Sequence, residues 1–267
     1  MKLLVQGDDF GFTRGVTYGI IDAIDNGILR CTGLFTNMPS SEFAASFIKD
    51  RPQACFGIDF NIVSGPSVAD PRKIPALVDE NGEFIRSTVR VKDPRFQTEE
   101  GRIEMFPYEQ VDMEIRAQYQ RFIELTGKKP GYLHGHSLMH ENYMKSIRNL
   151  SAETGIPFSM DITSKYKFGS LFAKMGPKAP GMNKKVFDPE AQLAKDSIKQ
   201  VLDNKDYLNS FEYAMIGGHP GYIDAELLKL TTLSLERCKD QEMCVSPEIR
   251  KWVEESGIEL ITYYDLY

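Results

Sequence analysis

The feature that most constrains the fold of this chain is a repeated alternation of short apolar runs with longer amphipathic stretches. Seven runs rich in β-branched and aromatic residues predict strands at residues 3–6, 31–36, 55–62, 132–136, 158–162, 213–216 and 258–262. Helices are predicted between them, at residues 16–25, 108–125, 143–153, 189–202, 225–236 and 247–255. Strands that alternate with helices are typical of α/β proteins with a parallel sheet, which is either open or closed into a barrel.

The domain organisation follows from the absence of any break in this alternation. The 267 residues contain no internal repeat and no low-complexity linker, so we expect a single domain over residues 1–267. Two segments fit the alternation poorly, at about residues 64–107 and 163–185, and both are rich in Gly, Pro and charge. Loops of this length in a compact domain are usually lids or binding loops, with plain surface insertions as the alternative.

Composition and charge exclude several classes of partner. The net charge is −6 and no cluster of Lys and Arg forms a basic face, which argues against a nucleic-acid partner. The first residues, MKLLVQGDDFGF, contain too short an apolar run for a signal peptide or a membrane span. The four cysteines have no CxxC spacing, so we interpret them as reduced and mostly buried thiols. We therefore expect a cytoplasmic protein without a nucleic-acid or membrane partner.

Polar residues follow four of the predicted strands. They are Asp8 and Asp9 after the first strand, Asn37 after the second, His134 and His136 at the end of the fourth, and His219 after the sixth. In parallel α/β sheets and barrels, reactive groups collect at the carboxyl ends of the strands. We therefore expect these side chains to surround one site.

The adjacent carboxylates Asp8 and Asp9 suggest a metal site. Two neighbouring carboxylates repel each other, and a cation bound to one of them relieves that repulsion. One oxygen can then ligate the metal while the other carboxylate takes a proton from a water molecule. The alternative is a structural role as a cap for the helix that begins near Thr13.

The third predicted strand places Asp59 and Asn61 on one face and apolar side chains on the other. An acid in such a strand is costly to bury without a partner or a metal. A solvent-exposed face is the alternative, but a parallel sheet covered by helices favours an inward-facing Asp59.

Three of the four histidines lie within seven residues, at positions 134, 136 and 140. In a strand His134 and His136 point the same way, and this spacing is typical of metal-binding pairs, with a hydrogen-bonded rim around a single ligand as the alternative. The fourth, His219, stands between two glycines and a proline, which hold it rigidly at a strand end. Such a histidine is suited to donate a proton to a leaving group, although a capping turn is an equally simple explanation.

These segments together resemble the YdjC-like carbohydrate deacetylase family, whose best-known members are chitooligosaccharide deacetylases. The resemblance covers nearly the whole chain in the same order, through residues 8–11 (DDFG), 57–61 (GIDFN), 64–66 (SGP), 134–140, 218–222 (GHPGY) and 257–266. It implies an α/β fold with a single distorted (β/α) barrel of about seven parallel strands. It also implies a divalent metal, magnesium or zinc, and hydrolysis of an N-acetyl group from an amino sugar or chitooligosaccharide.

The resemblance also implies roles for individual residues. Asp9, Asp59 and His136 correspond to the metal ligands, Asp8 to the general base and His219 to the general acid. Two positions depart from the family pattern, because position 59 is usually His and position 134 is usually Asp. An Asp-Asp-His ligand set is harder and more anionic, which favours Mg²⁺ or Mn²⁺ over Zn²⁺.

The remaining predictions concern the substrate. We expect the substrate-binding residues to be Asn37, Asn61, His134, His140 and Tyr222. Whether the sugar carries a phosphate group stays open. The basic loop residues Arg86, Arg90 and Lys92 could contact such a group, but they are more simply explained as solvated charges. Two alternative functions stay open. The protein could be a metal-dependent hydrolase of another amide or a phosphate ester, or a non-catalytic sugar-binding relative. The oligomeric state stays open, and the family resemblance is consistent with a homodimer.

Overall fold

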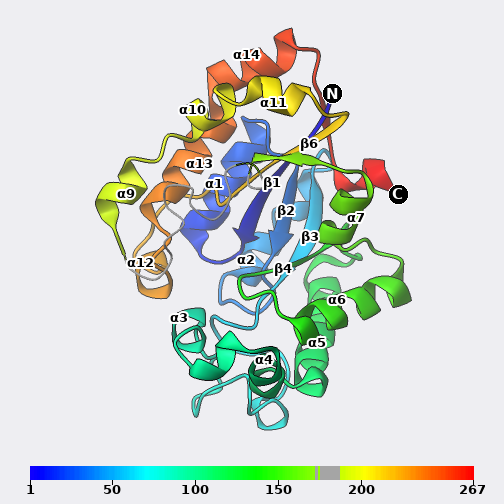
Figure 1. The fold of residues 1–267 in the computed structure, drawn as a ribbon, viewed down its shortest axis with the longest axis vertical. Helices are drawn as coiled ribbons and strands as arrows, with labels where there is room; N and C mark the ends of the chain where they lie inside the picture. The colour runs from blue at the N-terminus through cyan, green and yellow to red at the C-terminus, as the bar shows by residue number, and fades with distance from the viewer. Residues whose placement is uncertain (172–173, 175–186) are drawn as a thin grey trace.

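The computed structural model describes residues 1–171, 174 and 187–267, and its central element is a seven-stranded parallel sheet. The strands are β1 (Lys2–Phe10), β2 (Cys31–Leu34), β3 (Cys55–Phe60), β4 (Leu133–Gly135), β5 (Gly169–Ser170), β6 (Tyr213–Gly218) and β7 (Glu259–Ile261). Their order is β4-β3-β2-β1-β6-β5, and β7 also pairs with β1. The sheet curls into a half-barrel flanked by helices, which confirms the predicted α/β class with parallel strands (Figure 1).

Helices pack along the sheet and connect its strands. The α-helices are α1 (Arg14–Asp25), α2 (Ser41–Ala45), α3 (Ser87–Arg90), α4 (Glu99–Met105), α5 (Tyr108–Thr126), α6 (Glu141–Thr154), α7 (Ser159–Lys165), α9 (Pro189–Leu193), α10 (Ser197–Leu202), α11 (Lys205–Asn209), α12 (Leu227–Leu230), α13 (Leu235–Val245) and α14 (Pro247–Glu255). Their ends follow local sequence signals. The Thr13 side chain caps α1, and Gly127 ends α5 with a φ of 70°, a conformation that favours glycine.

The two faces of the sheet pack into different apolar clusters. Leu3 and Val5 of β1 belong to the main core, together with apolar residues of the helices. Leu4, between them, belongs to a smaller cluster with Cys31 and Cys55. This alternation is the period-two pattern of a strand that is buried on both faces. All four cysteines are free, and three of them are buried.

Three element predictions were wrong in detail. The predicted strand at 158–162 is reduced to a single bridge between Phe158 and Leu133, and α7 begins at the next residue. Short apolar runs do not distinguish a strand from a buried helix by periodicity alone. The predicted helix at 189–202 is divided into α9 and α10, because Asp196 starts a new helix by accepting a hydrogen bond from the Lys199 amide. The helix predicted at 225–236 is the four-residue α12, and the longer α13 begins only at Leu235.

The long segment at residues 64–107 is structured rather than a plain loop. It contains α3, α4 and the 3₁₀ helices η2 (Pro71–Lys73) and η3 (Pro94–Gln97), and it forms the lower part of the molecule in Figure 1. Most of the second predicted loop, at 163–185, lies outside the described residues. In the part of the chain that the structure describes, no helix is long and apolar enough to cross a membrane.

Candidate functional site

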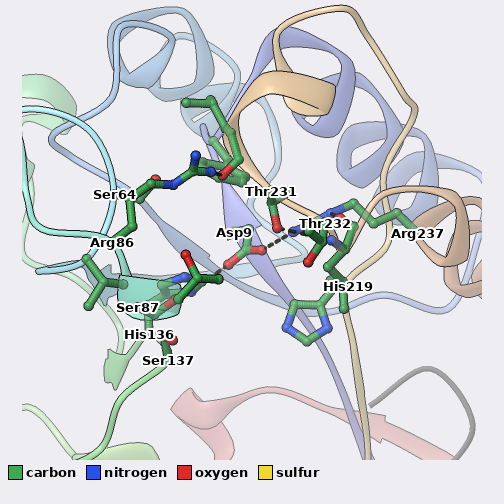
Figure 2. Close-up of a pocket in the computed structure, with 15 residues that line it drawn as sticks. Asp9, Ser64, Arg86, Ser87, His136, Ser137, His219, Thr231, Thr232 and Arg237 are labelled. Atoms are coloured by element: carbon green, nitrogen blue, oxygen red, sulfur yellow. Dashed lines mark hydrogen bonds and ion pairs between the residues drawn. The ribbon is translucent and has the colours of Figure 1, made fainter. Parts of the chain in front are cut away.

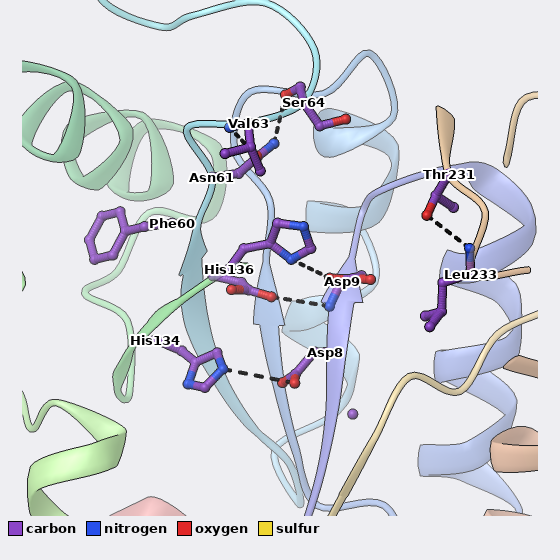
Figure 3. A network of polar contacts seen from close by, with 12 residues as sticks. Asp8, Asp9, Phe60, Asn61, Val63, Ser64, His134, His136, Thr231 and Leu233 are labelled. Atoms are coloured by element: carbon purple, nitrogen blue, oxygen red, sulfur yellow. Dashed lines mark hydrogen bonds and ion pairs between the residues drawn. The ribbon is translucent and has the colours of Figure 1, made fainter. Parts of the chain in front are cut away.

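Three potential metal ligands meet at the carboxyl ends of the strands. Asp9 lies near the end of β1, Asp59 near the end of β3, and His136 directly after β4. One oxygen or nitrogen atom from each lies within 4.8 Å of the other two. Figures 2 and 3 show Asp9 beside His136. The parallel arrangement of these strands brings together residues that are up to 127 positions apart, and it is the arrangement that the sequence predicted.

The backbone at Asp9 is unusual. Its φ is 72°, a left-handed conformation that non-glycine residues seldom adopt, and the register between β1 and β2 is irregular here. In a regular strand Asp8 and Asp9 would point to opposite faces. Instead, both carboxylates point toward the histidines of the β4 segment (Figure 3). Strain of this kind is concentrated at functional sites, where the surrounding structure maintains it.

Asp9 is fully buried and lies between two basic side chains. Its Oδ2 is 2.5 Å from Nη2 of Arg237, and its Oδ1 is 2.9 Å from Nδ1 of His136. Burial opposes ionisation, but the charges of Arg237 and His136 hold the pKa of the Asp9 carboxyl well below its usual range. Asp9 is therefore an ionised carboxylate inside the protein.

Asp59 is also fully buried, but its environment disfavours its charge. Its Oδ2 accepts a hydrogen bond of 3.2 Å from the amide of Asp9, whereas its Oδ1 has no hydrogen-bond partner. Burial and the negative charges of Asp8 and Asp9 raise the pKa of the Asp59 carboxyl well above its usual range. A cation at this point would offset the cost of burial and the repulsion from the charges of Asp8 and Asp9.

The three side chains fit a divalent metal ion in their chemistry. Two carboxylate oxygens and one imidazole nitrogen form a donor set that Mg²⁺, Mn²⁺ and Zn²⁺ all accept. The unpartnered Oδ1 of Asp59 is a buried acceptor for which no protein donor is provided. Such an atom is costly unless a ligand or an ion satisfies it.

A cavity of about 160 Å³ opens beside this cluster. Its lining includes Asp9, His136, His219 and Arg237, with the hydroxyl residues Ser64, Ser87, Thr88, Ser137, Thr231 and Thr232 around them (Figure 2). Arg86 also lines the cavity and contacts the carbonyl oxygens of Lys229 and Leu230. The Arg86 side chain thus joins the 64–107 segment to the end of α12.

Asp8, the predicted general base, is held by two side chains. Its Oδ1 accepts a hydrogen bond of 2.6 Å from Nε2 of Gln6, and its Oδ2 is 3.8 Å from Nε2 of His134. Gln6 in turn accepts a hydrogen bond of 2.6 Å from the hydroxyl of Tyr263. The negative charge of Asp8 contributes to the raised pKa of the Asp59 carboxyl, so Asp8 lies beside the cluster of potential metal ligands.

His219, the predicted general acid, lies across the cavity from His136 (Figure 2). It follows the last residue of β6, and its charge contributes to the low pKa of Asp9. The backbone amide of His219 donates a hydrogen bond of 2.9 Å to Oδ2 of Asp240. The structure therefore brings His219, Asp9 and His136 to one cavity, and Asp59 is buried beside Asp9 and His136.

The five predicted substrate-binding residues are not among the described residues that line the cavity. The amides of Asn37 and Asn61 are buried and donate to the carbonyl of Ser64, so they hold the segment that lines the cavity. His134 lies beside Asp8 and makes a 2.7 Å hydrogen bond with Ser159. Substrate contact by these three residues stays a prediction.

The other two predicted contacts lie away from the cavity lining. His140 is buried, caps α6 and stacks on Phe106 with 4.0 Å between ring centroids. Burial lowers the pKa of His140 to about 4, so it is neutral at physiological pH. Tyr222 is 42% exposed and donates a hydrogen bond of 2.7 Å to Asp22 on α1.

Sequence reasoning missed Arg237 and Asp240, the two buried charged residues that α13 presents to the site. The helix predicted at 225–236 ended before both of them. Their spacing of three residues on a helix was the available signal, because it places both on one face. The same spacing of charged residues is also found on the solvent-exposed face of a helix. Since the sequence suggested no partner for Arg237 or Asp240, the spacing did not distinguish the two cases.

Comparisons with known proteins identify relatives over the full length of the chain. The family described as YdjC-like protein matches residues 2–255. Carbohydrate deacetylase 2 of Listeria innocua is 32% identical, with 100% of this chain and 99% of that protein covered, and a carbohydrate deacetylase of Geobacillus stearothermophilus is 30% identical, with 99% and 97% covered. A crystal structure of a cellobiose-phosphate cleavage protein from Enterococcus faecalis V583 has a TM-score of 0.77 and 22% identity, with 99% of this chain and 98% of that chain covered, and shows the shared fold. The family match and these relatives show that the chain belongs to the YdjC-like protein family.

Proposed function

We propose that this protein is a metal-dependent hydrolase that removes N-acetyl groups from amino sugars or chitooligosaccharides. The observation that carries the proposal is the cluster of Asp9, Asp59 and His136 at the strand ends. Asp8 lies close enough to act on the charge of Asp59, and His219 lines the same cavity as Asp9 and His136. The carbohydrate deacetylases of Listeria innocua and Geobacillus stearothermophilus, similar over their full lengths, support this substrate class.

Asp9, Asp59 and His136 would hold the metal ion. Two carboxylates and one imidazole form a hard, anionic donor set, so we expect Mg²⁺ or Mn²⁺ in preference to Zn²⁺. A divalent ion in such a site lowers the pKa of a water molecule, polarises a carbonyl group and stabilises the negative charge that develops on its oxygen. Arg237 pairs with Oδ2 of Asp9, and Oδ1 lies beside Nδ1 of His136, so Oδ1 is the oxygen that would share a metal ion with His136.

Asp8 would act as the general base. Gln6 and His134 hold its carboxylate on the same side of β1 as Asp9. Asp8 takes a proton from the attacking water as the new C–O bond forms on the acetyl carbonyl carbon. The strained backbone at Asp9 supports this role, because it is what places the two carboxylates on one side.

His219 would act as the general acid. In its protonated form it donates a proton to the sugar nitrogen as the C–N bond breaks, which releases acetate and the free amine. Its place across the cavity from His136 suits the leaving group rather than the attacking water.

The cavity suits a small polar substrate group. Its volume of about 160 Å³ lies below the roughly 300–1,000 Å³ typical of pockets for drug-sized ligands. It would enclose an acetamido group and part of one sugar ring. The hydroxyl side chains of Ser87, Thr88 and Thr231 would meet the hydroxyl groups of that ring.

The test is acetate release from a panel of N-acetylated mono- and disaccharides, with and without a 6-phosphate. Asp8→Asn and His219→Ala should each lower kcat by about 100-fold or more, because each removes a proton-transfer group. His219→Ala should still bind Mn²⁺ with the affinity of the wild-type protein. Near-normal turnover in both variants would contradict the proposed roles.

The same panel separates the alternatives. Hydrolysis of phosphate esters without acetate release would indicate a metal-dependent phosphoesterase. Sugar binding without any hydrolysis, in a protein that gains no thermal stability from Mg²⁺, Mn²⁺ or Zn²⁺, would indicate a non-catalytic relative.

A further inference from the structure

Helix α13 connects the two halves of the site. It packs against α1, α9, α10 and α14, and it sends two buried charged side chains, Arg237 and Asp240, to the ends of different strands. Arg237 reaches Asp9 on β1, on the side of the potential metal ligands. Asp240 reaches His219 after β6, on the side of the general acid. The same helix therefore contacts both sides of the cavity.

We propose that Asp240 is a positioning residue that holds His219 in place for proton donation. The proposal rests on the proposed function, because it assumes that His219 is the general acid. Asp240 reaches the backbone of His219 rather than its ring. It therefore acts on the His219 backbone, and through it on where the imidazole lies.

The backbone amide of His219 needs a partner that the sheet does not provide. The paired register of β1 and β6 ends at Gly7 and Gly218, one residue before His219. Oδ2 of Asp240 accepts the hydrogen bond of this amide at 2.9 Å. Since a hydrogen bond to a charged acceptor is about twice as strong as one between neutral groups, it fixes the turn beyond the strand.

The residues on either side of His219 are adapted to this contact. A Cβ atom at Gly218 would lie 3.1 Å from Oδ2 of Asp240, so a side chain there would crowd the carboxylate. On the other side, Pro220 packs so closely against Gly7 that a Cβ atom at Gly7 would lie 2.7 Å from its ring. His219 is therefore held between a hydrogen bond and a packing contact.

Asp240 is itself held as a carboxylate. It is buried, its Oδ1 accepts a hydrogen bond of 2.7 Å from Ser197, and the same oxygen lies 2.7 Å from Nζ of Lys195. Burial opposes its charge, but Lys195 and the hydrogen bonds lower the pKa of the Asp240 carboxyl. A buried carboxylate with this many partners is rigid, which a positioning residue requires.

Loss of Asp240 should therefore affect the chemical step and spare binding. Displacement of a catalytic group by about 1 Å can cost roughly 100-fold in rate. Asp240→Ala should lower kcat by about 10- to 100-fold through this displacement. Its KM and its affinity for Mn²⁺ should stay within about threefold of wild type, because Asp9, Asp59 and His136 are untouched.

The experiment compares Asp240→Ala with the conservative Asp240→Asn and with Ser197→Ala. Asparagine keeps an oxygen that can accept from the His219 amide, so Asp240→Asn should recover most of kcat. Ser197→Ala removes one partner of the other carboxylate oxygen, which keeps its ion pair with Lys195, and should leave kcat near wild type. Hydrogen exchange of the peptide that covers residues 217–222 should be faster in Asp240→Ala and near wild type in the other two.

A second pair of variants separates the contact of Asp240 with His219 from its ion pair with Lys195, which also lies 3.5 Å from Glu236. Lys195→Met keeps the bond between Asp240 and His219, and Lys195→Met with Asp240→Ala removes it, so the difference in kcat between these two reports the Asp240 contact alone. Circular dichroism confirms that each variant is folded. The proposal is supported if the double variant is at least about tenfold slower than Lys195→Met and its 217–222 peptide exchanges faster.

Three results would overturn the proposal: wild-type kcat in Asp240→Ala, a loss confined to KM or Mn²⁺ affinity, or unchanged exchange at residues 217–222. A wild-type protein that releases no acetate from any sugar would instead refute the proposed function. In that case the exchange measurement still decides whether Asp240 fixes the turn at His219.

Discussion

At the scale of single residues, Asp59 explains most about the site. It is buried, one of its oxygens has no hydrogen-bond partner, and it stands where the resembled family usually has histidine. His134 stands at the other position that departs from the family pattern, and it pairs directly with Asp59 in the register of β3 and β4. The two unusual residues are therefore neighbours, and Asp59 lies among the potential ligands while His134 lies beside Asp8.

Asp59→Asn should weaken metal binding. The substitution keeps the shape of the side chain but removes one of the two negative charges among the potential ligands. We expect the rise in melting temperature caused by Mg²⁺ or Mn²⁺ in the wild-type protein to disappear in this variant. Asp203→Asn is a suitable control, because Asp203 is an exposed carboxylate paired with Lys199. An unchanged metal-dependent shift in Asp59→Asn would exclude Asp59 as a ligand.

Asp59→His should change the metal preference. A second imidazole makes the ligand set softer, so the ratio of Zn²⁺ to Mg²⁺ affinity should rise by about tenfold or more. Isothermal titration with each ion, on protein first treated with a chelator, measures this ratio. Equal ratios in the variant and the wild type would show that position 59 does not determine the metal.

At the scale of elements, α5 and the 64–107 segment form a buried polar network behind the site. Glu114 of α5 accepts hydrogen bonds from the amides of Val68 and Ala69 and from the side chain of Gln118. The Gln118 side chain in turn accepts a hydrogen bond from the Asn61 amide and donates one to the Asn61 carbonyl oxygen. The long segment that borders the cavity is therefore anchored to a helix of the main fold.

Glu114 should make stability depend on pH. Burial raises the pKa of its carboxyl from 4.5 to about 7, so the folded state favours the protonated acid. Its contribution to stability is therefore full below pH 4.5 and is lost as the pH rises through about 7, which amounts to about 3 kcal/mol. The free energy of unfolding, measured with urea, should fall between pH 5 and pH 8 by more in the wild type than in Glu114→Gln. A difference between the two proteins that is the same at both pH values would contradict this assignment.

Arg86 should control access to the cavity. Its side chain joins the 64–107 segment to the carbonyls at the end of α12, beside the hydroxyl residues that line the cavity. Arg86→Ala should raise KM several-fold with kcat nearly unchanged, because it loosens the wall of the cavity and leaves the potential ligands in place. Arg95→Ala is the matched control, since Arg95 pairs with Asp93 in the same segment. A fall in kcat at constant KM would show that Arg86 acts in the chemical step instead.

The outcome of the sequence predictions has a clear physical pattern at this scale. Strands β1, β2 and β3 are buried on both faces and have an unambiguous apolar pattern, so they and the polar residues near their ends were predicted. Strand β6 was predicted as well, although only alternate residues of its first half are buried. The strand at 158–162 was wrong because a short apolar run also suits the start of α7. Asp240 and Arg237 were missed because their importance depends on contacts with residues about 20 and 230 positions away, which local periodicity does not contain.

At the scale of the whole molecule, the sheet acts as a frame that collects side chains from distant parts of the chain. β1 lies at its centre and pairs with β2, β6 and β7, so its end lies between the potential ligands and His219. The half-barrel leaves this end of the strands accessible, and the 64–107 segment and the α12 region border it (Figure 1). A homodimer and a cytoplasmic location stay predictions of the sequence.

The central claim, a metal-dependent deacetylase centred on Asp9, Asp59 and His136, is tested most directly by metal add-back. The protein is treated with a chelator, and acetate release from N-acetylated amino sugars is measured before and after addition of Mg²⁺, Mn²⁺ or Zn²⁺. We expect no release without metal, restored release with Mn²⁺ or Mg²⁺, and no restoration in His136→Ala. Equal acetate release with and without metal, or full restoration in His136→Ala, would contradict the claim.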